Sequence, residues 1–139
     1  MKPKNILLIG GAGYIGTVLT EYLLLKNFKV TCIDSLLYSN KDSIKKFKEK
    51  KNYIFFLGDL RKKKTYNNIL KKSDVVIILA GLVGDPITKK YEKLSNSINL
   101  LGMKKFILDC AKLENLDRLI FISTCSNYGL SKKKNLIFK

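Results

Sequence analysis

Short apolar runs alternate with longer segments of mixed character along this chain. Continuous apolar runs are typical of strands that are buried on both faces of a sheet. The predicted strands are Asn5–Ile9, Phe28–Ile33, Tyr53–Leu57, Asp74–Leu79 and Leu119–Ser123. Because helical segments separate the strands, crossover connections are needed, and the strands are expected to be parallel with helices on both faces. The pattern predicts an α/β fold, a doubly wound Rossmann-type sheet in the order 3-2-1-4-5.

The segments between the strands carry the helix signals, and helical periodicity is clearest in two of them. In Tyr14–Lys26 the predicted apolar stripe consists of Ile15, Val18, Leu19, Tyr22 and Leu23. In Tyr91–Leu113 the predicted inward stripe consists of Ile98, Leu101, Phe106, Ile107 and Cys110. The lysine-rich segment Lys41–Lys51 is a further helix candidate, and Lys62–Lys72 is predicted to be a short helix or a loop.

A glycine-rich turn, "GGAGYIG", joins the first predicted strand to the first predicted helix. It places Gly10, Gly13 and Gly16 at the spacing G-x-x-G-x-x-G. The first glycine permits a tight turn, the second lets the backbone approach a pyrophosphate, and the third allows the helix to pack close to the strand. The helix N-terminus then presents unpaired N–H groups to the phosphates. The next strand ends in Asp34, which is placed to accept hydrogen bonds from a ribose 2′-hydroxyl.

These features predict a dinucleotide site, and the acid favours NAD over NADP. The Asp34 carboxylate would repel a 2′-phosphate, and Ser35, Leu36 and Leu37 offer no arginine to hold one. Two plainer interpretations stay open. A glycine-rich turn can occur without a ligand, and Asp34 can be a strand-end residue that caps the next helix.

The formal net charge of +16 raises the question of nucleic-acid binding. Of the 27 basic residues only Arg61 and Arg118 are arginines, the residue type that reads bases and phosphates bidentately. The lysines are scattered through every segment, and the aromatic residues do not interleave with them as stacking platforms would. The preferred interpretation is therefore a solvated lysine-rich surface. We predict no specific nucleic-acid partner, only nonspecific polyanion binding at low salt.

Length and the rarer residue types narrow the class further. At 139 residues the chain is expected to form one domain, residues 1–139. No apolar run approaches the ~20 residues that span a membrane, and the apolar stretch near the start is too short for a signal peptide. Cys32, Cys110 and Cys125 are odd in number and widely spaced, which fits reduced thiols in a cytoplasmic protein. The sequence contains no histidine, and no metal site is expected.

Several short motifs, taken in order, resemble one enzyme family. They are "GGAGYIG", the acid of "VTCID", "GDL" after the third strand, "LAGLVGDP" after the fourth, Asn99 in "SINLLG", and "STCSNYG" after the fifth. The chain resembles the N-terminal, cofactor-binding half of the NAD-dependent epimerase/dehydratase family, the extended short-chain dehydrogenase/reductases that act on nucleotide sugars. Two positions depart from the family pattern. Ile9 stands where threonine is usual, and Gly81 where alanine is common.

The resemblance implies a cofactor role for each matching position. The residues expected to cradle the pyrophosphate are Gly10, Gly13, Tyr14, Ile15 and Gly16. The adenosine ribose is assigned to Asp34, and the adenine is flanked by Asp59 and Leu60. The residues expected towards the nicotinamide ribose are Ala80, Gly81 and Leu82, with Asn99 bracing them from its helix.

The resemblance also implies a substrate side to the site. Thr124 falls where the family has the serine or threonine that hydrogen-bonds the sugar during hydride transfer, and Ser123 and Cys125 would shape the same pocket. The plainer alternative for "STCSNYG" is a polar strand end whose hydroxyls satisfy local backbone groups, with Tyr128 as a turn aromatic. For Val83–Pro86 the alternative is an ordinary loop.

In this family a Y-x-x-x-K pair lies on the helix that follows the fifth strand, and its tyrosine is the general acid/base. The match at Tyr22 and Lys26 lies instead in the first predicted helix, where Tyr22 belongs to the predicted apolar stripe. The catalytic pair, the sixth strand and the substrate-binding segment are therefore expected to be missing from this chain, with the fold truncated before them.

Two functions from different classes follow. The first is an NAD-dependent nucleotide-sugar epimerase or dehydratase, present as its cofactor-binding half and inactive alone, which would bind a nucleotide sugar once a C-terminal segment completes it. The second is a non-catalytic NAD(P)-binding Rossmann module or a truncated gene product. A homodimer and a complementing second chain both stay open. So do the sugar and the choice between epimerisation, dehydration and reduction.

Overall fold

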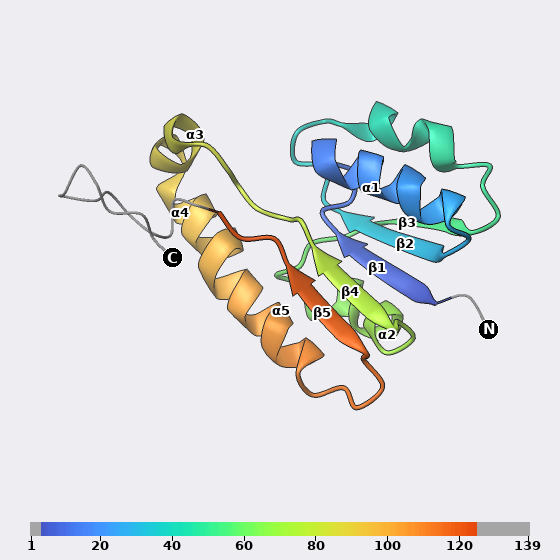
Figure 1. Ribbon diagram of the computed structural model, residues 1–139. Coiled ribbons are helices and arrows are strands. Elements are labelled where there is room, and N and C mark those ends of the chain that lie inside the picture. The colour runs from blue at the N-terminus through green and yellow to red at the C-terminus, as the bar shows by residue number, and fades with distance from the viewer. Residues whose placement is uncertain (1–3, 125–139) are drawn as a thin grey trace, which may run out of the picture.

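The computed structural model describes residues 4–124, which form a parallel five-stranded sheet (Figure 1). The strands are β1 (Asn5–Ile9), β2 (Lys29–Asp34), β3 (Tyr53–Leu57), β4 (Val75–Ile78) and β5 (Arg118–Phe121). Their order is β3-β2-β1-β4-β5, and every neighbouring pair is parallel. The predicted topology is therefore confirmed. The predicted strand bounds are close to the observed ones throughout.

Helical segments lie on both faces of the sheet. They are α1 (Tyr14–Leu25), η1 (Lys41–Phe47), η2 (Lys63–Thr65), α2 (Asn67–Leu70), α3 (Asp85–Lys90), α4 (Glu92–Ser95), η3 (Asn96–Gly102) and α5 (Met103–Cys110). Of these, η1 and η2 are 3₁₀-helices and η3 is a π-helical segment. Figure 1 shows α1 on one face of the sheet and α2 and α5 on the other. The sheet is thus doubly wound.

The central strands β1 and β4 are almost wholly buried because both faces of the sheet are covered there, whereas most residues of the edge strand β3 are exposed. Neighbouring strand residues such as Leu7 and Leu8 are both fully buried, yet they belong to different apolar clusters. The cluster on the α1 side consists of Ile6, Leu8, Leu23, Val30, Cys32, Phe47, Tyr53 and Ile77. The cluster on the α5 side consists of Leu7, Ile9, Ile33, Leu60, Tyr66, Leu70, Val76, Ile78, Met103, Phe106 and Cys110.

The apolar stripe predicted for the first helix is wrong at three positions. The side chains that are more than half exposed there are Ile15 (59%), Val18 (62%) and Tyr22 (56%). The buried residues of α1 are instead Gly16, Thr20 and Leu23. A Cβ atom on Gly16 would lie 2.5 Å from the Gly11 carbonyl oxygen, so the helix turns this face towards the loop. Thr20 and Leu23 follow on the same face at helical spacing.

The helix predicted for Lys41–Lys51 is wrong in type and length. Only η1 is helical there, and it is a 3₁₀-helix. Its two buried residues, Ile44 and Phe47, are three positions apart. A 3₁₀-helix has three residues per turn, so it places both side chains on one line facing the core.

The long helical region predicted over Tyr91–Leu113 is close to the observed one, because α4, η3 and α5 follow one another without a gap over residues 92–110, and the separate helix α3 precedes them. Asp85, inside the segment whose alternative interpretation was a plain loop, already starts α3. Within η3 the hydrogen bonds span five residues, which widens the turn. Leu101, predicted to face inwards, is consequently 61% exposed, and Gly102 is buried in its place. Four of the predicted inward residues are buried or partly buried: Ile98, Phe106, Ile107 and Cys110.

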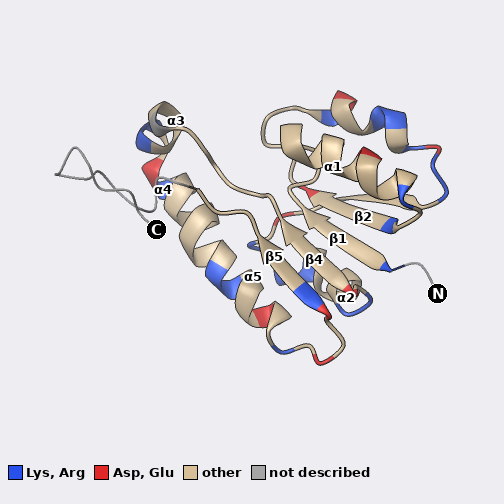
Figure 2. Cartoon of the chain, viewed as in Figure 1, with Lys and Arg blue, Asp and Glu red and all other residues tan. Residues whose placement is uncertain are grey.

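Charged side chains are spread over many elements. Figure 2 shows lysine and arginine on helices, strands and several connections of the described chain. Within residues 4–124 we find no helix that is both long enough and apolar enough to cross a membrane.

Candidate functional site

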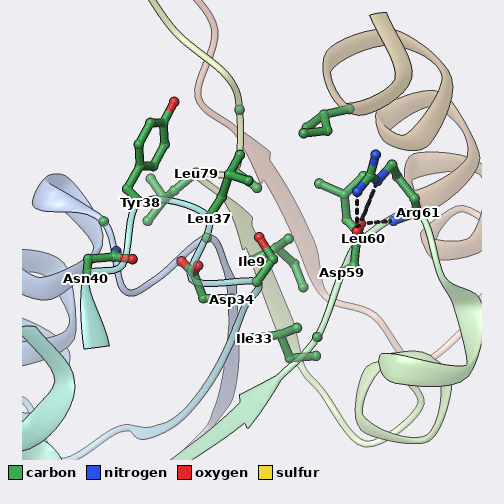
Figure 3. A pocket seen from close by; sticks show the side chains of 17 residues that line it. Ile9, Ile33, Asp34, Leu37, Tyr38, Asn40, Asp59, Leu60, Arg61 and Leu79 are labelled. Carbon is green, nitrogen blue, oxygen red and sulfur yellow. Dashed lines mark hydrogen bonds and ion pairs between the residues drawn. The ribbon is translucent and has the colours of Figure 1, made fainter. Parts of the chain in front are cut away.

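A cavity of about 170 Å³ opens at the carboxyl ends of the strands (Figure 3). It lies where the chain order reverses between β1 and β4, the position at which open parallel sheets bind ligands. Its lining residues come from the ends of β1 and β2, the glycine loop after β1, the loop after β2, the turns after β3 and β4, and η3. They are Ile9, Gly10, Gly13, Ile33, Asp34, Ser35, Leu37, Tyr38, Asn40, Gly58, Asp59, Leu60, Arg61, Leu79, Ala80, Gly81 and Ile98.

The glycine loop forms one wall of this cavity. Gly10 has a φ of +82°, and a Cβ atom there would lie 2.5 Å from the Ala80 nitrogen, so the fold itself requires glycine. Gly13 is the N-cap of α1 and is different. A Cβ atom on Gly13 would meet only the Gly10 carbonyl oxygen, at 3.5 Å. The protein therefore leaves open space in front of Gly13, at the helix terminus where an anion is favoured.

Asp34 closes the end of β2 and holds the glycine loop. Its Oδ2 accepts a hydrogen bond from the Ala12 nitrogen at 3.0 Å, and its Oδ1 accepts one from the Leu36 nitrogen at 2.8 Å. The N-cap residue of η1 is Asn40, and the Asp34 carboxylate bonds to nitrogens outside η1, so Asp34 is not the cap of the next helix. A carboxylate offers about four acceptor positions. About two of them remain for the hydroxyls of a ligand.

Asn40 is a cavity residue that the sequence analysis missed. Its Nδ2 donates to the Ala12 carbonyl oxygen at 2.6 Å, which ties the loop after β2 to the glycine loop. Its Oδ1 is buried and has no hydrogen-bond partner in the described structure. Buried acceptors are almost always paired, so this one is open to a donor that the described residues do not supply, either a water molecule or a ligand hydroxyl. Asn40 lies in an irregular loop, where no periodic pattern marks it.

The turn after β3 contributes an ion pair to the cavity wall. Arg61 donates from Nε to both carboxylate oxygens of Asp59 at 3.0 Å and from Nη2 to Oδ2 at 2.6 Å. The Arg61 backbone nitrogen donates to Oδ1 at 2.9 Å. The hydrogen bond from the Arg61 side chain holds the pKa of the Asp59 carboxyl below its usual value, and burial opposes this only in part. Asp59 is therefore ionised and accepts hydrogen bonds only.

The side-chain amide of Asn99 helps to hold the segment after β4, whose Leu79 and Ala80 nitrogens also donate to the Ile9 carbonyl oxygen. Asn99 in η3 accepts a hydrogen bond from the Leu82 nitrogen at 2.8 Å and donates to the Leu82 carbonyl oxygen at 2.7 Å. Leu82 itself is buried and does not line the cavity. Asn99 therefore fixes the path of the chain beyond Ala80 and Gly81, which do line it.

The predicted site residues divide into two groups. Those that line the cavity are Gly10, Gly13, Asp34, Asp59, Leu60, Ala80 and Gly81. Those that do not are Tyr14, Ile15, Gly16, Leu82, Asn99, Ser123 and Thr124. Tyr14 and Ile15 are exposed on the first turn of α1. Ser123 and Thr124 are exposed just beyond β5, and Cys125 to Gly129 of "STCSNYG" lie outside the described residues.

The other lining residues carried no assigned cofactor role: Ile9, Ile33, Ser35, Leu37, Tyr38, Asn40, Gly58, Arg61, Leu79 and Ile98. The match at Tyr22 and Lys26 does not line the cavity either. The sequence contains a second Y-x-x-x-K match, Tyr128 and Lys132. It follows Thr124 by only four residues and lies outside the described part of the chain.

The described cysteines offer no reactive thiol. Cys32 and Cys110 are fully buried and free. Burial raises the pKa of each thiol to about 12, so neither is a thiolate at neutral pH. Among residues 4–124 we find no cluster of three or more acidic, histidine or cysteine side chains that could hold a metal ion.

Residues 6–137 match the family model described as the NAD dependent epimerase/dehydratase family. A bifunctional UDP-glucose 4-epimerase and UDP-xylose 4-epimerase of Pisum sativum is 34% identical over 142 aligned positions. That alignment covers 95% of this chain but 40% of the relative. The chain thus spans less than half the length of the curated relatives it matches.

Solved structures agree with this match. An epimerase of Methanothermobacter thermautotrophicus superposes with a TM-score of 0.85 at 26% identity, covering 97% of this chain and 40% of that one. The UDP-glucose 4-epimerase of Thermus thermophilus, solved in complex with NAD, gives a TM-score of 0.66 at 26% identity. It covers 76% of this chain and 33% of that one.

Proposed function

Because the chain belongs to the NAD-dependent epimerase/dehydratase family, we propose that it is the cofactor-binding half of a nucleotide-sugar epimerase or dehydratase, inactive alone. Its relatives are NAD-dependent enzymes of nucleotide sugars, of which it covers about 40%. The sugar-binding and acid/base groups of such an enzyme are then supplied by a further segment or by a second polypeptide.

The observation that supports this proposal best is the convergence of three groups on one cavity. Gly13 leaves open space at the N-terminus of α1, Asp34 keeps free acceptor positions, and Asn40 carries a buried acceptor without a partner. A dinucleotide would fill the first with its pyrophosphate and satisfy the other two with ribose hydroxyls. The residues present therefore fit NAD.

The other assigned cofactor contacts lie in the turns after β3 and β4. The adenine is assigned to Asp59 and Leu60, beyond the end of β3, and the nicotinamide ribose to Ala80 and Gly81, beyond β4. When bound, NAD supplies a hydride acceptor for a sugar carbon. Thr124, beyond β5, is assigned a hydrogen bond to the sugar, and Ser123 lies next to it.

The cofactor is assigned as NAD and not as NADP. The Asp34 carboxylate already accepts two backbone hydrogen bonds, and a carboxylate at this position repels a 2′-phosphate. Arg61 is the single basic residue among the described lining residues, and it is paired with Asp59. We further propose a cytoplasmic protein, because its buried thiols suit a reducing compartment.

A second candidate is a non-catalytic NAD-binding module. It is favoured by Tyr22, which is exposed on α1 and does not line the cavity, so the described Tyr22–Lys26 pair cannot serve the site. The two candidates differ in turnover of nucleotide sugars once the missing part is supplied. They share NAD binding.

Calorimetric titration of the purified chain with NAD tests the shared claim. We expect saturable binding that weakens at least about tenfold in Asp34→Ala, because acceptors for the ribose are lost. The control is Asp42→Ala, which removes an equal charge from a side chain that is 86% exposed. Equal affinity in Asp34→Ala and the wild type, or no binding by the wild type, would contradict the proposal.

A further inference from the structure

Arg61 occupies the cavity without an assigned role. It is the one basic side chain among the described lining residues, in a cavity that contains two carboxylates, Asp34 and Asp59. A bound dinucleotide adds a negatively charged pyrophosphate. Pairing with Arg61 offsets the charge of one carboxylate, so the cavity does not present two uncompensated acids to an anionic ligand.

The Asp59–Arg61 contact does more than balance charge. Three donors of Arg61, its backbone nitrogen, Nε and Nη2, reach the carboxylate at 2.6–3.0 Å. Of about four acceptor positions on a carboxylate, about one is then left for a ligand. A guanidinium holds a carboxylate in a fixed plane, which a lysine ammonium cannot do. The remaining acceptor position therefore has a defined direction.

The side chain of Arg61 also contacts two residues of η3. Its Nη1 donates to the Ser97 hydroxyl at 3.2 Å. A Cβ atom on Gly102 would lie 2.7 Å from the Arg61 Cγ, so the glycine allows the arginine stem to lie against η3. Figure 3 shows Arg61 beside Asp59, on the side of the cavity opposite Asn40. The π-helical segment thus carries both the anchor of Arg61 and Asn99, which holds Leu82.

The position of Asp59 after the edge strand β3 determines which part of a bound dinucleotide it would contact. The pyrophosphate position at Gly13 lies next to the end of β1, Asp34 ends β2, and Asp59 follows β3. Moving outwards along the sheet, a ligand presents its phosphate, its ribose and then its base. An ionised carboxylate at the edge of that base accepts hydrogen bonds and repels other acceptors. It selects a base with an exocyclic amine.

We propose that Arg61 is a positioning residue that orients Asp59 to select adenine over a base with a carbonyl group at the same position. The inference rests on the proposed function, because it presumes that NAD enters this cavity. Arg61 acts through Asp59 and is assigned no contact with the cofactor.

The test compares NAD with nicotinamide hypoxanthine dinucleotide, in which a carbonyl oxygen replaces the adenine amine. We expect the wild type to prefer NAD by about tenfold or more, the size of one charge-assisted hydrogen bond. In Arg61→Gln the preference should fall several-fold towards equality. Arg61→Lys, which keeps the charge but not the planar fork, should lie between them.

Arg118→Gln is the matched control, since Arg118 is the other arginine of the chain and lies at the opposite end of β5 from the cavity edge. It should keep the wild-type preference. Melting temperatures are measured for every variant, because a merely structural role would lower stability and leave the preference unchanged. If Arg61→Gln does not fold, Arg61→Lys and Ser97→Ala are compared by the same ratio.

The outcomes separate the two claims. A wild type that binds neither dinucleotide overturns the proposed function. A wild type that binds both equally, or an Arg61 variant that folds and keeps the full preference for NAD, leaves the proposed function intact and overturns the role of Arg61.

Discussion

Gly13 and Gly16 are three residues apart in one loop, and the fold uses them differently. Gly16 faces the Gly11 backbone, where any side chain would collide. Gly13 faces open space, and its φ of −72° suits other residues as well. The sequence motif predicts glycine at both positions but does not show which one serves packing and which one serves a ligand.

This difference yields a prediction with opposite outcomes at the two positions. Gly13→Ala should change the free energy of unfolding by no more than about 1 kcal/mol, the range for an N-cap substitution, yet weaken NAD binding, because the methyl group enters the pyrophosphate space. Gly16→Ala should lower stability by about 1–3 kcal/mol or more through overpacking against Gly11. Urea unfolding and NAD titration measure both. A stable Gly13→Ala protein with wild-type affinity would argue against a ligand at this loop.

Whether a site residue could be predicted from the sequence depends on the element in which it lies. Asp34 could be predicted because it ends a strand directly after a glycine motif. Asn40 could not, because it reaches the cavity through a loop with positive φ at Leu36 and Ser39, which no periodicity marks. Arg61 was counted as a charge only, since its pairing with Asp59 depends on the turn after β3.

At the scale of elements, strands were easier to predict than helices. Strands covered on both faces must be apolar throughout, so their bounds appear directly in the sequence. A helix buries one face, and which face depends on packing. In α1 that face was set by Gly16, and a periodicity of large apolar residues pointed to Val18 instead. In η3 the widened turn shifted the phase, so Leu101 turned outwards.

One buried polar cluster, away from the cavity, joins α5 to the segment around α2. Asp109 is nearly buried and accepts hydrogen bonds from Lys63 Nζ at 2.9 Å and from the Tyr66 hydroxyl at 2.8 Å. The hydrogen bond from Lys63, with that from Tyr66, holds the pKa of the Asp109 carboxyl below its usual value. The cluster holds α5 in place, and α5 directly follows η3, the segment that contains Asn99.

The pH dependence of this cluster follows from the sign of the shift. A carboxyl whose pKa is lower in the folded state stabilises the protein above its unfolded pKa of about 3.9, and this contribution is lost as the pH falls through the folded value. At pH 7 we expect Asp109→Asn to lower the free energy of unfolding by about 1–2 kcal/mol. The difference from wild type should shrink as the pH falls below about 4.

Urea unfolding, followed by circular dichroism at pH 7 and again at a pH below about 4, measures this effect. Asp42→Asn is the control, because its ion pair with Lys45 is exposed and screened by solvent, so its loss should leave the stability close to that of the wild type at both pH values. A deficit of Asp109→Asn that stayed constant down to the lowest pH would show that the Asp109 charge does not stabilise the fold.

At the scale of the whole molecule, residues 4–124 form one parallel sheet with helices on both faces. The cavity lies at the carboxyl ends of these strands. The strand order could be predicted from the sequence, because alternating strands and helices allow few topologies. The sugar side could not be predicted in the same way. Ser123 and Thr124 are the described residues assigned to it, and about 60% of the length of the matched relatives is not covered by this chain.

The most direct test of the central claim is a map of where NAD binds, from nitrogen–proton correlation spectra of the labelled 15.8 kDa chain during titration. We predict saturable shifts that gather on the glycine loop and on the turns after β2, β3 and β4, with the amides of Gly10, Gly13, Asp34 and Ala80 among those that move. Shifts scattered over the lysine-rich surface and abolished by moderate salt would show nonspecific anion binding. That result would contradict the assignment of this cavity to NAD.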